Sequence, residues 1–124
     1  MSGWAVIFCG SRDWKSVETI AERVASYPED TIIIHGACRG ADLIAQACAV
    51  RLGYTIVPVP YFHWMGKRGG PERNRAMLEI LLAYKSLDKR VAVEAFPLNG
   101  PGTQNMIDLA KDAGVPFREN KLHE

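Results

Sequence analysis

Short apolar runs alternate with helix-like segments along the whole chain, and this alternation constrains the fold more than any other feature. The first run, Trp4–Cys9, is continuously apolar, as expected for a strand covered on both faces. Thr31–His35 is a second such run and is rich in β-branched residues. Similar reasoning predicts strands at 4–9, 31–35, 54–59, 90–95 and 115–118, and helices at 17–26, 41–52, 71–85 and 103–113.

Strands that alternate with helices in this order predict right-handed crossovers and a mostly parallel sheet. The expected fold class is therefore α/β, a Rossmann-like three-layer sandwich with a mostly parallel sheet of about five strands. No internal repeat, low-complexity tract or linker interrupts the 124 residues, and 48% of them are apolar. We therefore expect a single domain over residues 1–124, with enough apolar side chains to fill its core.

The charge balance and the cysteines limit the classes of partner. Fifteen basic and 14 acidic residues leave a net charge of +1, which argues against a general nucleic-acid coat. No stretch approaches the ~18 apolar residues of a membrane span, and the first residues lack the pattern of a signal peptide. Three cysteines without a regular framework favour reduced thiols, so we expect a cytoplasmic protein. No spacing of His, Cys and Asp indicates a metal site, and no cofactor is predicted.

Glycines, polar residues and basic residues gather in the four segments that follow predicted strands. In a parallel α/β sheet, ligands bind beyond the carboxyl ends of the strands, so these segments predict a ligand site. The candidate ligand-binding residues are Gly10, Ser11, Arg12, Asp13, Gly36, Arg39, Gly40, Asp42, Lys67, Gly70, Pro71, Arg73, Asn74, Gly100, Gly102 and Thr103.

These residue types suit a phosphate-bearing ligand. Glycine lets the backbone approach a ligand closely, and a helix start offers free N–H groups with partial positive charge. Asp13 and Asp42 are placed to accept hydrogen bonds from ribose hydroxyls. Four cations are placed to add charge-assisted hydrogen bonds to phosphate: Arg12, Arg39, Lys67 and Arg73.

Several of these features also have a purely structural interpretation. Asp42 and Thr103 are both suited to cap a helix start, and the segment 67–70 is equally compatible with a solvated loop. His63 lies in a loop, where it fits either a ligand site or the surface. The aromatic residues Tyr61, Phe62 and Trp64 fit a stacking wall for a base, a cover over the sheet end or a dimer contact.

Four motifs together closely resemble one known family. They are Gly10-Ser11-Arg12-Asp13, then His35-Gly36-x-x-Arg39-Gly40-Ala41-Asp42, then Gly66-Lys67-x-x-Gly70-Pro71-x-Arg73-Asn74, then Gly100-x-Gly102-Thr103. This set resembles the YspA-related branch of the SLOG superfamily, which also contains the Smf/DprA proteins and the "Lonely guy" enzymes. The resemblance runs over nearly the whole chain. It implies a Rossmann-like fold, a nucleotide or nucleotide-derived ligand, and a homodimer or higher homo-oligomer.

The "Lonely guy" enzymes, which cleave an N-glycosidic bond, give a useful comparison. Gly100, Gly102 and Thr103 match the phosphate-binding part of their Pro-Gly-Gly-x-Gly-Thr-x-x-Glu signature, and Arg73 matches their helix arginine approximately. Met106 stands where the signature has glutamate, and Asn99 replaces its first glycine. Since methionine cannot perform acid–base chemistry, the weak catalytic candidates are Arg73 with Asp42 or Glu72.

Three functions follow, in order of preference. The first is binding of a nucleotide or nucleotide-derived ligand, for sensing or sequestration, because the loops are suited to phosphate and the catalytic set is incomplete. The alternative is a nucleoside or nucleotide N-glycosidase with a non-standard catalytic set. The second alternative, single-stranded DNA binding, is disfavoured by the near-neutral charge.

Overall fold

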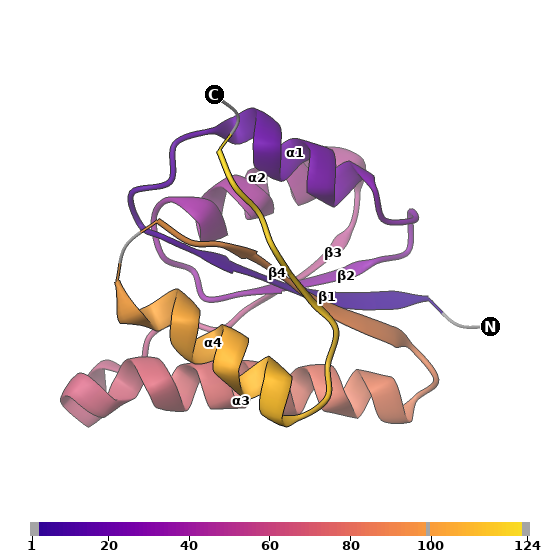
Figure 1. Ribbon diagram of the computed structural model, residues 1–124. Helices are drawn as coiled ribbons and strands as arrows, with labels where there is room; N and C mark the ends of the chain where they lie inside the picture. The colour runs from indigo at the N-terminus through magenta and orange to yellow at the C-terminus, as the bar shows by residue number, and fades with distance from the viewer. Residues whose placement is uncertain (1–2, 99, 123–124) are drawn as a thin grey trace.

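Five strands form one parallel sheet in the computed structural model, which describes residues 3–98 and 100–122 (Figure 1). The sheet order is β3-β2-β1-β4-β5, which is that of the first five strands of the dinucleotide-binding Rossmann fold. The predicted Rossmann-like fold is therefore confirmed. The strands are β1 (Trp4–Gly10), β2 (Ile32–His35), β3 (Thr55–Pro58), β4 (Arg90–Phe96) and β5 (Phe117–Glu119). The helices are α1 (Val17–Ala25), α2 (Ala41–Leu52), the 3-10 helix η1 (His63–Arg68), α3 (Gly69–Ser86) and α4 (Pro101–Asp112).

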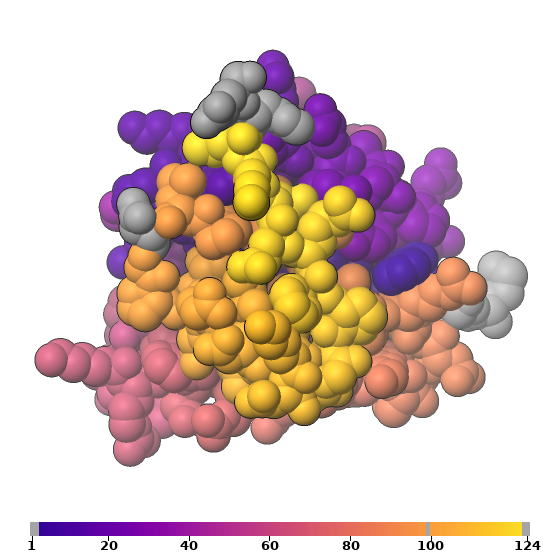
Figure 2. Space-filling view, in the orientation of Figure 1, coloured from indigo at the N-terminus to yellow at the C-terminus, as the bar shows by residue number. Residues whose placement is uncertain are grey.

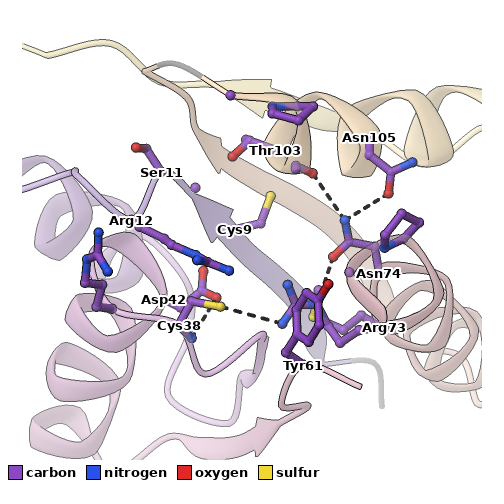
Figure 3. Close-up of a pocket in the computed structure, with 18 of the residues that line it drawn as sticks. Cys9, Ser11, Arg12, Cys38, Asp42, Tyr61, Arg73, Asn74, Thr103 and Asn105 are labelled. Atoms are coloured by element: carbon purple, nitrogen blue, oxygen red, sulfur yellow. Dashed lines mark hydrogen bonds between the residues drawn. The ribbon is translucent and has the colours of Figure 1, made fainter. Parts of the chain in front are cut away.

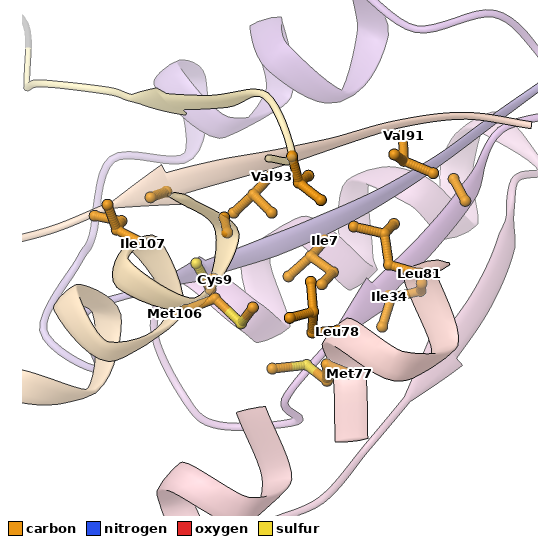
Figure 4. Close-up of a cluster of buried hydrophobic side chains, with 14 of the residues drawn as sticks. Ile7, Cys9, Ile34, Met77, Leu78, Leu81, Val91, Val93, Met106 and Ile107 are labelled. Carbon is orange, nitrogen blue, oxygen red and sulfur yellow. The ribbon is translucent and has the colours of Figure 1, made fainter. Parts of the chain in front are cut away.

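Helices cover both faces of the sheet and make a three-layer sandwich. Helices α1 and α2 lie on one face, and α3 and α4 lie on the other (Figure 1). The side chains of β1 alternate between these faces, since Val6 and Phe8 pack with the first pair of helices and Ile7 and Cys9 pack with the second. Figure 4 shows the second core, between the sheet and α3 and α4. In the space-filling view, α4 and the chain after it cover much of the facing side (Figure 2).

The strand order places a switch point between β1 and β4. After β1 the chain builds β2 and β3 on one side of that strand, and it then crosses to the other side to build β4 and β5. The connections that leave β1 and β4 therefore diverge, toward α1 on one face and α4 on the other. A crevice opens between such diverging connections, and it is the usual ligand position in this class of fold.

Two helices begin earlier than predicted, and one predicted loop is partly helical. Helix α3 begins at Gly69, two residues before Pro71, and η1 occupies the segment expected to be a loop. Helix α4 begins at Pro101, so Thr103 lies in its first turn and is not the N-cap, which is Gly100. Proline suits the first turn because its missing N–H would have no partner in the helix there. Asn99 lies outside the described residues.

The apolar face of α3 packs against the sheet and is not left free for self-association. Met77, Leu78 and Leu81 are at most 8% exposed and pack in the core against the sheet, with Leu82 partly buried beside them. The sheet therefore occupies this face, and the prediction of a homodimer or higher homo-oligomer rests on the family resemblance alone. Within residues 3–98 and 100–122, no helix is long and apolar enough to cross a membrane.

A buried carboxylate in the middle of β4 joins three parts of the chain. Glu94 is 1% exposed, and Arg23 donates to both of its oxygens at 2.8 and 3.0 Å. The Tyr27 hydroxyl donates to Oε2 at 2.5 Å, and Asn120 Nδ2 donates to Oε1 at 3.1 Å. Burial opposes the ionisation of Glu94, but these hydrogen bonds outweigh it and hold the pKa of the carboxyl below its usual value. The network therefore fixes α1 and the segment after β5 to the central sheet.

We predict that Glu94→Gln destabilises the protein by about 3 kcal/mol at pH 7, because the variant leaves Arg23 without its anionic partner. The lowered pKa means that this stabilisation is present above the carboxyl's unfolded pKa and is lost as the pH falls through the folded value. Urea unfolding at pH 7 and at pH 3 measures the difference, which should shrink at the lower pH. Glu79→Gln, on the exposed side of α3, is the matched control. An equal effect of both variants would contradict the assignment.

Candidate ligand-binding site

A cavity of about 630 Å³ lies at the crevice beside the carboxyl ends of β1 and β4 (Figure 3). This volume is in the range of small-molecule sites, roughly 300–1,000 Å³. Its walls come from the segments after β1, β2 and β4 and from the first turns of α3. The structure thus brings together groups from four separate predicted segments.

The predicted ligand-binding residues line this cavity, except Gly36 and Gly40. Gly36 borders a second, adjacent cavity, and Gly40 lines neither. Five further residues, to which the sequence did not point, also line the cavity: Cys9, Cys38, Met77, Pro101 and Asn105. Met77 lies one helical turn after Arg73, so helical spacing from the predicted arginine was a signal that could have found it. Cys9 is the residue before the predicted Gly10.

The glycines of the site fall into two groups. A Cβ atom on Gly40 would lie 2.4 Å from the Ser11 carbonyl oxygen, and its φ of +81° also disfavours other residues. A Cβ on Gly36 would lie 2.4 Å from Arg73 Nη1, and one on Gly10 would lie 2.6 Å from Ala41 Cβ. These three glycines are required by contacts within the protein.

Gly100 and Gly102 differ from that group. Among residues 3–98 and 100–122, no heavy atom lies within 4 Å of the position of a Cβ on either residue, apart from their chain neighbours and the helix's own backbone. Both line the cavity, and Gly100 has a φ of +103°, which favours glycine. The start of α4 is therefore open toward the space where a ligand would lie, and protein packing does not account for its glycines.

Arg73 and Asn74 connect the walls of the cavity. Arg73 is 9% exposed, and its Nη1 donates to the Gly36 carbonyl at 2.7 Å, while its Nε donates to Asn74 Oδ1 at 3.0 Å. Asn74 Nδ2 in turn donates to the Gly102 carbonyl at 3.2 Å and to Asn105 Oδ1 at 2.9 Å (Figure 3). The two side chains thus hold α3 against both the segment after β2 and the start of α4.

Asp42 is the buried carboxyl group of the cavity wall. It is 5% exposed, its Oδ2 accepts the backbone N–H of Cys38 at 3.3 Å, and its buried Oδ1 has no partner among the described residues. Burial raises the pKa of Asp42 to about 6, although the Cys38 N–H and the charge of Arg73 favour the ionised form. Since α2 begins at Ala41 with Gly40 as its N-cap, Asp42 does not cap the helix.

Three other cations of the site are exposed. Arg12, Arg39 and Lys67 reach the cavity from three different segments. The Arg39 guanidinium lies 3.7 Å from the Asp13 carboxylate, but both side chains are more than 70% exposed, so this pair contributes little to stability. The starts of α2, α3 and α4 face the same space and add partial positive charge. The site is therefore suited to an anionic ligand.

The structure places two of the three weak catalytic candidates in the cavity wall and the third outside it. Asp42 and Arg73 both line the cavity, whereas Glu72 does not and lies 3.7 Å from Arg75. Met106, at the position of the "Lonely guy" glutamate, is fully buried in the core. Glu72 is therefore not placed to act in this site.

The three aromatic residues after β3 lie in three different environments. Tyr61 lines the cavity, Phe62 packs against the core, and Trp64 is 79% exposed. His63 borders the second cavity, and its ring centroid lies 4.9 Å from that of Tyr61. Of the three aromatic residues, only Tyr61 is in position to contact a ligand in the main cavity.

Fold and cavity together define a Rossmann-like α/β protein with an anion-suited site at its switch point. Within that class, a profile of the YspA, cpYpsA-related SLOG family matches residues 4–60. The "Gene 61 protein" of Mycobacterium phage D29 is 31% identical over 126 aligned positions, which cover 90% of this chain and 91% of the phage protein. The chain belongs to the YspA, cpYpsA-related SLOG family. Membership of this family favours nucleotide-related ligands in general, and the phage protein's name specifies none.

We predict that Asp42→Asn stabilises the protein at neutral pH and has little such effect at pH 4. The folded pKa of about 6 lies above the ordinary value of 3.8, so wild-type stability falls as the pH rises between these values. The variant removes this cost, which amounts to about 3 kcal/mol for a shift of this size. Chemical unfolding at pH 4 and pH 7.5 measures the difference in stability between the variant and the wild type. A gain in stability that does not depend on pH would contradict the raised pKa of Asp42. Asp13→Asn, at an exposed carboxylate, is the control.

Proposed function

We propose that this protein binds a nucleotide or nucleotide-derived ligand in the main cavity and thereby senses or sequesters it. The observation that carries the proposal is the open start of α4. There Gly100 and Gly102 leave space in front of the helix, and the buried Thr103 lines the same wall. Backbone N–H groups at a helix start are a favourable position for phosphate.

The surrounding groups support this position for the phosphate. Lys67, Arg12 and Arg39 are exposed cations in the cavity wall, and each is able to reorient toward an anion. Arg73, by contrast, is buried and hydrogen-bonded to the Gly36 carbonyl, so in this proposal it mainly holds the site in shape. Asp13 is the exposed acceptor for a ribose hydroxyl, and the Tyr61 ring is placed to lie against a base.

Binding is tested by isothermal titration calorimetry and thermal shift with the common nucleoside 5′-monophosphates and with the matching nucleosides. At least one monophosphate should raise the melting temperature, and its nucleoside should not, because only the first carries the phosphate. Lys67→Ala, near the start of α3, should weaken binding about tenfold, as expected for loss of one charge-assisted hydrogen bond.

Lys85→Ala, in the last turn of the same helix, is the matched control and should leave the affinity unchanged. Equal shifts of the melting temperature from nucleosides and monophosphates would mean that the phosphate does not contribute to binding. The absence of any shift would contradict the proposed function itself.

A second candidate function is hydrolysis of the N-glycosidic bond of a bound nucleotide. It is favoured by one observation, the Asp42 carboxyl beside Arg73 in the cavity wall, with its pKa raised to about 6. A carboxyl group with such a pKa is suited to give a proton to a leaving base while water adds to the sugar carbon C1′.

This activity is tested by chromatography for free base after incubation with nucleoside 5′-monophosphates. Wild type should release base, and Asp42→Asn should lose at least 100-fold in rate while it still binds nucleotide. If binding is observed without release by the wild-type protein, the protein is a binding module. If the variant releases base at the wild-type rate, Asp42 has no catalytic role.

A further inference from the structure

A second cavity of about 340 Å³ adjoins the main one on the side of β2. The two share four wall residues, Arg12, Cys38, Arg39 and Tyr61, so they adjoin along these side chains. The remaining wall of the second cavity comes from the segment after β2 and from the residues that lead into η1, including Pro60 and His63. A ligand in the main cavity is therefore able to extend past Arg12 and Arg39 into the second.

The charges of the two cavities differ. The main cavity is lined by both cations and carboxylates, since Asp13 and Asp42 belong to its wall. The second cavity is lined by the guanidinium groups of Arg12 and Arg39 and by His63, and none of the described residues in its wall is acidic. Its two guanidinium groups are hydrogen-bond donors, and the carboxylate of Asp13, 3.7 Å from Arg39, forms only an exposed pair with it and belongs to the wall of the main cavity. Two guanidinium groups in one wall suit an anionic group.

Three neutral polar groups near the second cavity are already engaged in hydrogen bonds within the protein. The backbone N–H of Ala37 donates to His35 Nδ1, and the N–H of Cys38 donates to Asp42. The Tyr61 hydroxyl donates to the Gly66 carbonyl at 2.8 Å. The side chains of Arg12, Arg39 and His63 are exposed and therefore available to a ligand. Guanidinium groups donate hydrogen bonds and cannot accept them, whereas neutral base edges need acceptors as well as donors, so the two arginines favour a phosphate over a base.

From these observations, and resting on the proposed function, we infer that the second cavity is a separate anion subsite. The ligand would then be a nucleotide derivative with two anionic groups. One group lies at the start of α4, and the other lies beyond Arg12 and Arg39, next to His63. A simple mononucleotide fills only the first of these positions.

The test compares probes with one and two phosphate groups by isothermal titration calorimetry at 150 mM salt. The probes are the 5′-monophosphates, 5′-diphosphates and 3′,5′-bisphosphates of adenosine and guanosine. At least one probe with two phosphate groups should bind tenfold or more tightly than the corresponding monophosphate. Salt at this concentration screens charges beyond ~8 Å, so long-range attraction does not produce the difference.

His63→Glu isolates the second cavity, because His63 lines only that one. The variant places a carboxylate in a wall that lacks one, and it should abolish the tenfold advantage while the monophosphate binds as before. His63→Gln, which keeps a neutral polar side chain, should retain at least part of the advantage. Lys67→Ala, in the main cavity only, should weaken both kinds of probe.

Two results would overturn the subsite while leaving the proposed function intact. One is equal affinity for probes with one and two phosphate groups. The other is an equal loss of affinity for both kinds of probe in His63→Glu, which would mean that the second cavity holds the base or the sugar. If no probe binds, the proposed function fails, and the subsite fails with it.

Discussion

The parallel pairing of β1 with β4, which runs from Trp4 opposite Arg90 to Gly10 opposite Phe96, is the interaction on which the site depends. It continues past the strand, since the Ser11 N–H donates to the Phe96 carbonyl at 3.0 Å. The two chains separate only after this last hydrogen bond, one toward α1 and the other toward α4. The crevice therefore begins at a fixed point, and the open helix start and the exposed cations are positioned around it.

Several polar side chains near this crevice stabilise the fold by hydrogen bonds within the protein. Arg73 has the appearance of a phosphate-binding residue, yet it is buried and donates to the Gly36 carbonyl of a segment 37 residues away in sequence. Gly36 in turn needs to be glycine because the Arg73 guanidinium occupies the space of a side chain. The groups left for a ligand are those without such a role, namely the α4 start and the exposed cations.

The sequence predicts the architecture well because periodicity and apolar content report directly on burial. The alternation of strands and helices predicted a parallel sheet. In such a sheet the segments that follow the strands meet at one edge, so the sequence also predicted which loops lie together. The sequence could not distinguish a glycine needed for packing from one that faces a cavity, since the positive φ of Gly40 and the atoms opposite Gly40 and Gly102 depend on the tertiary structure. Helix starts were misplaced by two residues at α3 and α4, because a proline in the first turn is compatible with more than one starting point. The burial of Glu94 and its partners involves residues far apart in sequence, which no local pattern reports.

The proposed binding depends above all on a phosphate at the start of α4. The most direct test is an NMR titration of the ¹⁵N-labelled protein with a nucleoside 5′-monophosphate that binds, followed through the backbone amides. We expect the largest chemical-shift changes at Gly102 and Thr103, with smaller ones at Ser11 and Arg12 across the crevice. Changes confined to α1 or β5, away from the crevice, with the amides of Gly102 and Thr103 unmoved, would contradict this position of the phosphate.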